Sequence, residues 1–247
     1  MKNFILEKII NNKLNSISFL DQTPNGLQIE GCQEITKIIS GVTACQELLD
    51  YAVKVKANGI IVHHGYFWNN ESKKIQGMKK TRLQTILSNN INLFSWHLPL
   101  DYHSKLGNNI QIANKLNIKV LGVLSSKLYY GEFCSPLYAS DLIKKITCEF
   151  GRVPLYCDIK NKNKISSVAW CSGKGQSLIY KAASHHIDAF ITGEFSEDTI
   201  HCARENNIHF FSIGHHASEK FGIQALTNWL VKKFHLDCTF INIENIA

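Results

Sequence analysis

Proline is scarce in this chain of 247 residues, with only four, and charged residues make up 19% of it, whereas apolar residues reach 45%. Disordered, collagen-like and low-complexity chains show the opposite balance, so the composition excludes those classes. A chain of this length buries roughly 70 to 75% of the surface that its unfolded form exposes. We therefore expect one large or two modest domains that fold without disulfides or a structural metal ion.

Long hydrophobic runs are also missing. No stretch approaches the roughly 18 uncharged apolar residues that are typical of a membrane-spanning helix. The first apolar run, Phe4 to Leu6, has three residues, whereas the central region of a signal peptide needs about seven to fifteen. We therefore expect a soluble, cytoplasmic protein without a membrane partner.

The eight cysteines include no CxxC pair and no tight cluster. Zinc knuckles and the disulfide frameworks of small secreted domains depend on such spacings. We therefore expect reduced cysteines that serve mostly as small, buried apolar residues.

Acidic residues are the minority charge, because 20 Asp and Glu stand against 27 Lys and Arg, for a net charge of +7. A dense basic stretch runs from Lys73 to Arg82. Such a stretch is more often a solvated helix surface than a surface for an anionic partner. Composition therefore gives only weak support to nucleic acid as a partner.

Predicted strands and helices alternate along the chain, which is typical of an α/β protein. Apolar residues at helical spacing, beginning with Phe4, predict an amphipathic helix over residues 4–14. Thr43 and Gln46 are spaced as a capping box at the start of a second helix, which ends at Asn58. The other predicted strands are 35–40, 60–62, 91–95, 165–171, 187–192 and 208–213, and the other predicted helices are 79–89, 137–151, 176–185, 196–206 and 218–234.

One strand–helix–strand pattern occurs twice. Residues 39–61 and 168–190 span equal lengths, and Gly41 and Gly173 end their first strands at equivalent points. The match predicts a duplicated architecture, although two unrelated βαβ units can resemble each other by chance. The turn Gly173-Lys174-Gly175-Gln176 lacks the spacing of a phosphate-binding loop and is interpreted as a strand-to-helix turn.

Side chains that can bind metals follow three predicted strands. In open α/β sheets, ligands collect outside the carboxyl ends of the strands. The six residues at these ends are His63 and His64, His97 and Asp101, and His215 and Glu219. A lone pair of adjacent histidines is more often packed or solvated than bound to metal, and a lone HxxxE on a helix is no better than even. The pair His185-His186, at a helix end without a carboxylate partner, is interpreted as a surface pair. The joint pattern of three strand ends favours a metal site.

The spacing within these pairs suits a shared site. Adjacent histidines of a strand point to opposite faces, so His63 and His64 can face one site only where the strand ends, and Gly65 supplies that break. His215 and Glu219 stand four residues apart, which places both on one face of a helix. Two carboxylates with three or four imidazoles exceed what a single catalytic zinc uses, and they fit two ions bridged by a carboxylate.

Six segments in this order resemble the YbgI-like, or GTP cyclohydrolase 1 type 2 homolog, family of dinuclear metal-binding proteins. They are PNGLQIEG from Pro24, GVTAC from Gly41, GIIVHHG from Gly59, WHLPLDYHSKLGNN from Trp96, ITGEFSEDTIHCARENNI from Ile191 and GHHASEKFGIQAL from Gly214. The resemblance covers essentially the whole chain. It implies that the metal ligands are His63, His64, Asp101, His215 and Glu219, and it places His97 beside the metals or as a proton carrier.

The resemblance also implies two interlocked α/β domains with mixed sheets and a toroidal homohexamer whose sites face an internal cavity. We place the metal-site domain at residues 1–119 together with 190–247, and a second, smaller domain at 120–189. Glu194 and Glu197 follow a strand of the second repeat, where we expect them to face the same cavity.

The expected chemistry is hydrolytic. Two divalent ions lower the pKa of bound water and favour an anionic substrate, so we expect a metal-dependent hydrolase that acts on a phosphate- or nucleotide-containing molecule, with His97 as the proton donor. The ligand set suits zinc, iron, manganese or nickel. The alternative is a non-enzymatic metal-binding or scaffold protein, associated with DNA or another partner through its basic surface.

Overall fold

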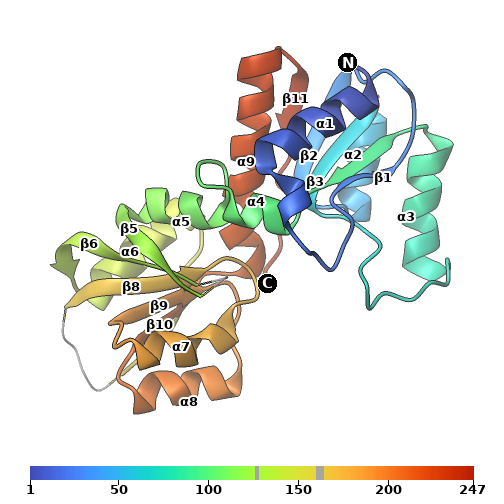
Figure 1. The fold of residues 1–247 in the computed structure, drawn as a ribbon. Coiled ribbons are helices and arrows are strands. Elements are labelled where there is room, and N and C mark those ends of the chain that lie inside the picture. The colour runs from blue at the N-terminus through green and yellow to red at the C-terminus, as the bar shows by residue number, and fades with distance from the viewer. Residues whose placement is uncertain (126–127, 160–163) are drawn as a thin grey trace. The chain divides into compact units, whose positions relative to one another are not determined.

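The computed structural model describes residues 1–125, 128–159 and 164–247. These residues divide into two compact α/β units (Figure 1). The first unit consists of residues 1–107 and 220–243, and the second consists of residues 108–219 and 244–247. The units differ from the expected division at 119 and 190, because residues 108–119, 190–219 and 244–247 belong to the second unit.

A five-stranded mixed sheet forms the centre of the first unit, in the order β1-β4-β3-β2-β11. Only β1 runs antiparallel to its neighbour. The strands are β1 (Gly26–Ile29), β2 (Lys37–Thr43), β3 (Gly59–His64), β4 (Asn92–Ser95) and β11 (Asp237–Phe240). The register pairs Val62 of β3 with Ser95 of β4, so these two parallel strands end at the same edge of the sheet.

Helices cover both faces of this sheet. On one face, α1 (Asn3–Leu14) and α9 (His215–Phe234) pack with residues such as Ile61 of β3. On the other, α2 (Gln46–Lys54) and α3 (Gly77–Ser88) pack with Ile60 and Val62. Because both faces are buried, β3 is apolar without alternation, as parallel strands usually are. The short helices of this unit are η1 (Ser16–Ser18) and α4 (Leu98–Tyr102).

The second unit contains a six-stranded mixed sheet in the order β5-β6-β8-β9-β10-β7. Its parallel centre is β8 (Ile165–Cys171), β9 (Ala189–Thr192) and β10 (His209–Ser212). Antiparallel strands lie on both sides, namely β5 (Ile118–Ser125), β6 (Leu128–Leu137) and β7 (Leu155–Cys157). Its helices are α5 (Asn108–Leu116), α6 (Ala139–Phe150), η2 (Gln176–Leu178), α7 (Ile179–Ser184) and α8 (Glu197–Glu205).

Helix α9 belongs to both units. Its first turn, through Glu219, lies in the second unit, and the helix continues from Lys220 into the first. Ile223, Leu226 and Leu230, at spacings of three and four, are completely buried in the core of the first unit. One unbroken helix therefore joins a core-forming stripe to the residues that follow β10.

The predicted α/β class and the two predicted βαβ units are present. The strands β2 and β3 are parallel around α2, and β8 and β9 are parallel around α7. None of the helices among the described residues combines the length and apolar character needed to cross a membrane.

The local predictions at Thr43 and Phe4 were wrong. Cys45, not Thr43, is the N-cap of α2, and no side chain caps this helix. The Thr43 hydroxyl instead lies 3.2 Å from Nδ1 of His64. Phe4 was predicted on the apolar face of α1, but 58% of it is exposed, because the buried stripe passes through Leu6 and Ile10.

Candidate metal centre

The end of β3 brings two imidazoles together. His63 is completely buried and His64 is half-buried, and their ring centroids are 4.5 Å apart. Gly65 follows them, and a Cβ at this position would collide with the side chains of Gln28 and Ser95. Glycine is therefore required for the close turn at which both imidazoles are presented.

The end of β4 adds His97 and Asp101 to this edge. Asp101 lies in α4 and is buried, with its Oδ1 3.5 Å from Nε2 of His63 and its Oδ2 4.0 Å from Nε2 of His97. Ligand nitrogens of His63, His64 and His97 all lie within 4.8 Å of one another. We call His63, His64, His97 and Asp101 the first ligand group. They form a cluster within the first unit that can hold a cation.

The second unit carries a second ligand group, His215 and Glu219, at the start of α9. The Nε2 of His215 is 3.1 Å from Oε2 of Glu219, and its Nδ1 is 2.7 Å from Oε1 of Glu194. Burial alone would lower the pKa of His215, but the two carboxylates raise it to about 9. Negative charge therefore dominates around this imidazole, which favours a cation.

Gly173, at the end of β8, allows the backbone to approach the second ligand group. It has a φ of +60°, and a Cβ at this position would collide with the Glu219 carboxylate and lie 3.1 Å from Nε2 of His215. Its N–H donates to the Ser218 hydroxyl over 2.9 Å. The predicted turn at residues 173–176 thus packs its backbone closely against the side chains of the second ligand group.

All four histidines of the two groups use Nδ1 in the same way. An oxygen atom lies 2.7 to 3.2 Å from each Nδ1. The oxygens belong to the Trp96 carbonyl for His63, the Thr43 hydroxyl for His64, the Asp21 carboxylate for His97 and the Glu194 carboxylate for His215. Carbonyl and carboxylate oxygens only accept, so Nδ1 of His63, His97 and His215 carries a proton, and Nε2 is the nitrogen that faces the acidic residues of the two groups, at 3.5 and 4.0 Å from Asp101 for His63 and His97 and at 3.1 Å from Glu219 for His215. Metal-binding histidines almost always show this arrangement, so the residues fit a metal ion.

Asp21 is a residue of this site that the sequence did not indicate. Its carboxylate accepts hydrogen bonds from Nδ1 of His97 (2.8 Å), the amide of Asn25 (3.0 Å) and the backbone N–H of Leu98 (2.9 Å). Burial alone would raise the pKa of Asp21, but the bonds from His97 and Asn25 lower it to about 2. The only sequence signal nearby was the turn at residues 24–26, which says nothing about a partner 76 residues away.

The chain matches the model of the Duf34/NIF3 (NGG1p interacting factor 3) family over residues 1–246. It belongs to this family. It is 57% identical over 247 residues to a GTP cyclohydrolase 1 type 2 homolog of Buchnera aphidicola subsp. Schizaphis graminum (strain Sg), and 52% identical to that of Escherichia coli (strain K12), each comparison covering 100% of both chains.

Solved structures of the family share the fold. Protein ybgI matches over 100% of both chains with 52% identity and a TM-score of 0.98. A protein from Thermus thermophilus also matches over 100% of both chains, with 28% identity and a TM-score of 0.90. The resemblance inferred from the six sequence segments is therefore confirmed for the family and for the fold.

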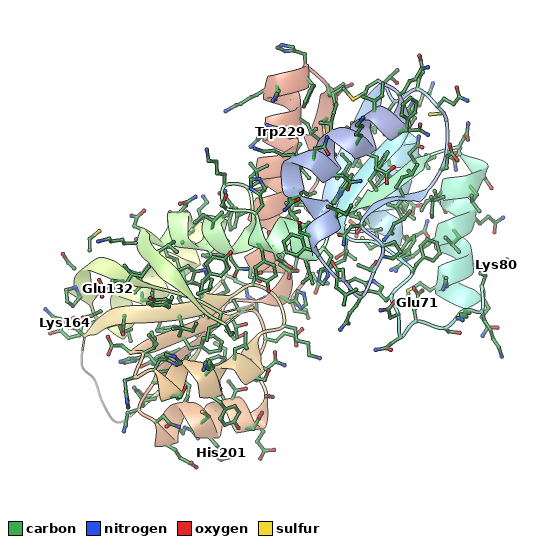
Figure 2. All side chains as sticks on the ribbon, in the orientation of Figure 1. Glu71, Lys80, Glu132, Lys164, His201 and Trp229 are labelled. Atoms are coloured by element: carbon green, nitrogen blue, oxygen red, sulfur yellow. The ribbon has the colours of Figure 1, made fainter. Side chains whose placement is uncertain are left out.

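The predicted site residues of this family member fall into the two ligand groups described. Of the two acidic residues expected to face the same cavity, Glu194 contacts His215. The Glu197 side chain is instead 93% exposed and lies 4.0 Å from His201, a residue that Figure 2 shows on α8. His185 and His186 are exposed, as predicted for a surface pair.

Proposed function

We propose that the two ligand groups form one dinuclear divalent-metal centre, and that the chain is a metal-dependent hydrolase of phosphate- or nucleotide-containing substrates. The observation that carries this proposal is the common use of Nδ1 by the four histidines, each with Nδ1 2.7 to 3.2 Å from an oxygen atom, which leaves Nε2 as the nitrogen that would bind the metal ions. The proposed ligands are His63, His64, Asp101, His215 and Glu219, and His97 is the proposed proton carrier.

The covalent structure of α9 supports the joining of the groups. Glu219 precedes Lys220, which belongs to the first unit, within one continuous helix. The buried carboxylates of Asp101 and Glu219 also favour this proposal, because buried charges are expensive unless they are paired or bind metals. Two divalent ions would bring four positive charges against these two negative ones, and the remaining charge favours an anionic substrate.

When bound, the ions would activate water and polarise a phosphoryl or carbonyl group. The chain's own residues supply the rest. Asp21 holds the proton of His97 on Nδ1, so Nε2 can take up a proton from an attacking water and return it to the leaving group. The Oδ2 of Asp101 lies 4.0 Å from that Nε2, so a proton carried there would be close to a carboxylate.

Elemental analysis of the purified protein tests the centre. We expect two divalent ions per chain, with Glu219→Ala losing both, since Glu219 is the proposed bridge, and Asp101→Ala chiefly weakening one. Glu197→Ala is the matched control, because it removes an exposed carboxylate outside both groups. A single tightly held ion in the native protein would contradict the dinuclear centre.

A screen of phosphoesters and nucleotides with the metal-loaded protein tests the hydrolase. We expect turnover that disappears in Glu219→Gln and persists in Glu197→Gln. Stable binding of both ions with no turnover of any substrate in the screen would instead favour a metal-binding or scaffold protein.

A further inference from the structure

The loop that follows β3 builds a second feature beside the first ligand group. Residues of the segment 67–79 line a pocket of about 510 Å³, among them Phe67, Trp68, Lys73 and Lys79. This volume lies within the range of about 300 to 1,000 Å³ that is usual for small-molecule sites. The ring of Trp68 stands edge-on to that of His97, with centroids 5.0 Å apart. The pocket therefore shares one wall with the proposed metal centre.

The loop is held rigid around this pocket. Gln28 accepts a hydrogen bond from the Tyr66 N–H and donates to the Tyr66 carbonyl, and the Tyr66 hydroxyl donates to the Ala44 carbonyl. The Glu71 carboxylate accepts from the N–H groups of Phe67 and Trp68. Figure 2 shows Glu71 in the loop that leads to α3. A rigid loop of this kind loses little conformational freedom when a ligand binds.

Phe67 occupies an unusual backbone conformation in this loop. Its φ is +64°, which is rare and costly for a bulky residue and is found mostly at functional sites. The side chain is 38% exposed at the pocket, and Ile75, another lining residue, is 61% exposed. The hydrogen bonds of Glu71 thus hold an aromatic ring at the surface, where it can stack on a planar group.

The charge of the pocket suits an anion. Lys79 is paired with Glu71 (3.1 Å), donates to the Ser72 carbonyl (2.7 Å) and places its Nζ 5.9 Å from the centroid of the Phe67 ring, whereas Lys73 is exposed, so the lining carries two cations against one carboxylate. A larger pocket of about 770 Å³ lies along α1, but its wall carries Glu7 and Asp21 against Lys8. Of these two, the pocket at residues 67–79 is the one that favours a negative ligand.

We propose that the pocket lined by Phe67, Trp68, Lys73 and Lys79 binds a nucleotide, with its base on the face of the Phe67 ring away from Lys79 and its phosphates at Lys73. This inference rests on the proposed hydrolase and names the class of its substrate. It also explains Lys73, the first residue of the basic stretch Lys73 to Arg82, which takes no part in the metal centre. The shared wall at Trp68 places the ligand beside His97.

Calorimetric titration of the metal-loaded protein with the non-hydrolysable imidotriphosphates of guanosine and adenosine, and with inorganic imidodiphosphate, tests the pocket. Lys73→Ala should weaken all three by about five- to tenfold, because it removes a charge-assisted contact. Lys74→Ala is the matched control. Lys74 is the exposed neighbour and does not line the pocket, so its loss should change affinity by less than about twofold. Equal effects of the two variants would overturn the proposal in favour of general electrostatic attraction.

The aromatic part is tested by Phe67→Ala and by Phe67→Leu, which keeps an apolar side chain. Both should weaken the nucleotides by about tenfold, since a stacked base contributes about 1 to 3 kcal/mol, and leave imidodiphosphate within about twofold. Equal weakening of nucleotides and imidodiphosphate would exclude a base on Phe67. Circular dichroism confirms that each variant is folded.

Metal content, measured on the same samples, separates the two proposals. Two bound ions with no difference between Lys73→Ala and Lys74→Ala would remove the pocket and leave the hydrolase. Nucleotide binding that depends on Lys73 and Phe67 in a chain without two ions would retain the pocket and remove the dinuclear centre.

Discussion

Oxygen atoms remote in sequence set the ring orientation of the histidines that could bind metal. Asp21 is the most informative of these partners, because it is charged, its side chain is only 2% exposed, and it holds a ring 76 residues away. The contribution of Asp21 to stability can be measured separately from metal binding, because the lowered pKa of Asp21 makes the free energy of unfolding depend on pH.

Asp21→Asn should lower the free energy of unfolding at pH 7 by about 2 kcal/mol, which corresponds to the decrease in pKa from 3.8 to about 2. Because the folded-state pKa is the lower one, this stability is present above pH 4 and is lost as the pH falls towards 2. Urea denaturation between pH 2 and pH 7 measures the effect. Asp237→Asn, which removes an exposed carboxylate, should change stability by less than about 1 kcal/mol.

Gly173 and Gly77 form a matched pair for testing the wall of the second ligand group. Both have positive φ, +60° and +55°, but a Cβ at Gly77 meets nothing within 4 Å, whereas one at Gly173 collides with Glu219. Each substitution by alanine should cost about 1 kcal/mol of backbone strain. Only Gly173→Ala should also lower metal content in elemental analysis, and equal metal content in the two variants would contradict a role for this close approach.

Among the secondary-structure elements, the parallel strands were predictable and the partners of the histidines were not. The apolar run of β3 and the histidines after it indicate a strand end, and the edge where β3 and β4 end follows from parallel pairing. Thr43 was predicted as a helix cap because capping is a local pattern, but its hydroxyl faces His64 on the neighbouring strand. Contacts of this kind depend on the assembled sheet, so the sequence near Thr43 does not encode them.

The hairpin of β5 and β6 was missed for a different reason. Leu121 and Val123 of β5 are 44% and 56% exposed, so apolar residues do not mark a single buried face of this strand. Helix α9 was predicted from Ser218, but it begins at His215, because nothing in the sequence before Ser218 has the apolar spacing of the rest of the helix. The start at His215 agrees with the spacing of His215 and Glu219, which predicted both on one face of a helix.

Helix α9 should tolerate change on its exposed side only. Leu226→Ala should lower the free energy of unfolding by about 2 to 5 kcal/mol, because Leu226 is completely buried in the core of the first unit. Val231→Ala, at a position that is 37% exposed, should cost less than about 1 kcal/mol. Chemical denaturation measures both, and similar losses would show that the two faces of α9 are not distinguished by burial.

At the scale of the whole molecule, the fold should not depend on bound metal. Each unit has its own buried apolar core, in contrast to a zinc finger. Removal of the ions by a chelator should leave the far-ultraviolet circular dichroism and a cooperative unfolding transition in place. The free energy of unfolding should fall only by the contribution of metal binding to the folded state, a few kcal/mol for tight binding. Unfolding upon chelation would show that the ions are structural.

The toroidal homohexamer that the family resemblance implies, and that we propose for this chain, makes a separate prediction. Light scattering on the purified chain should give a mass near six subunits, because the proposal places the metal centres around a shared internal cavity. A stable monomer at micromolar concentration would remove that cavity from the model of function.

The first unit is built from both ends of the chain, and this has a consequence for synthesis. Strand β11 pairs with β2, and α9 covers one face of the sheet, yet both follow the entire second unit in sequence. On the ribosome, β2 therefore waits as an unpaired edge, with Ile38 and Ile61 covered only from the side of α1, until residues 220–243 emerge. The second sheet contains all its strands before that point, so its unit can fold first, and the nascent first unit is the part that needs protection from aggregation.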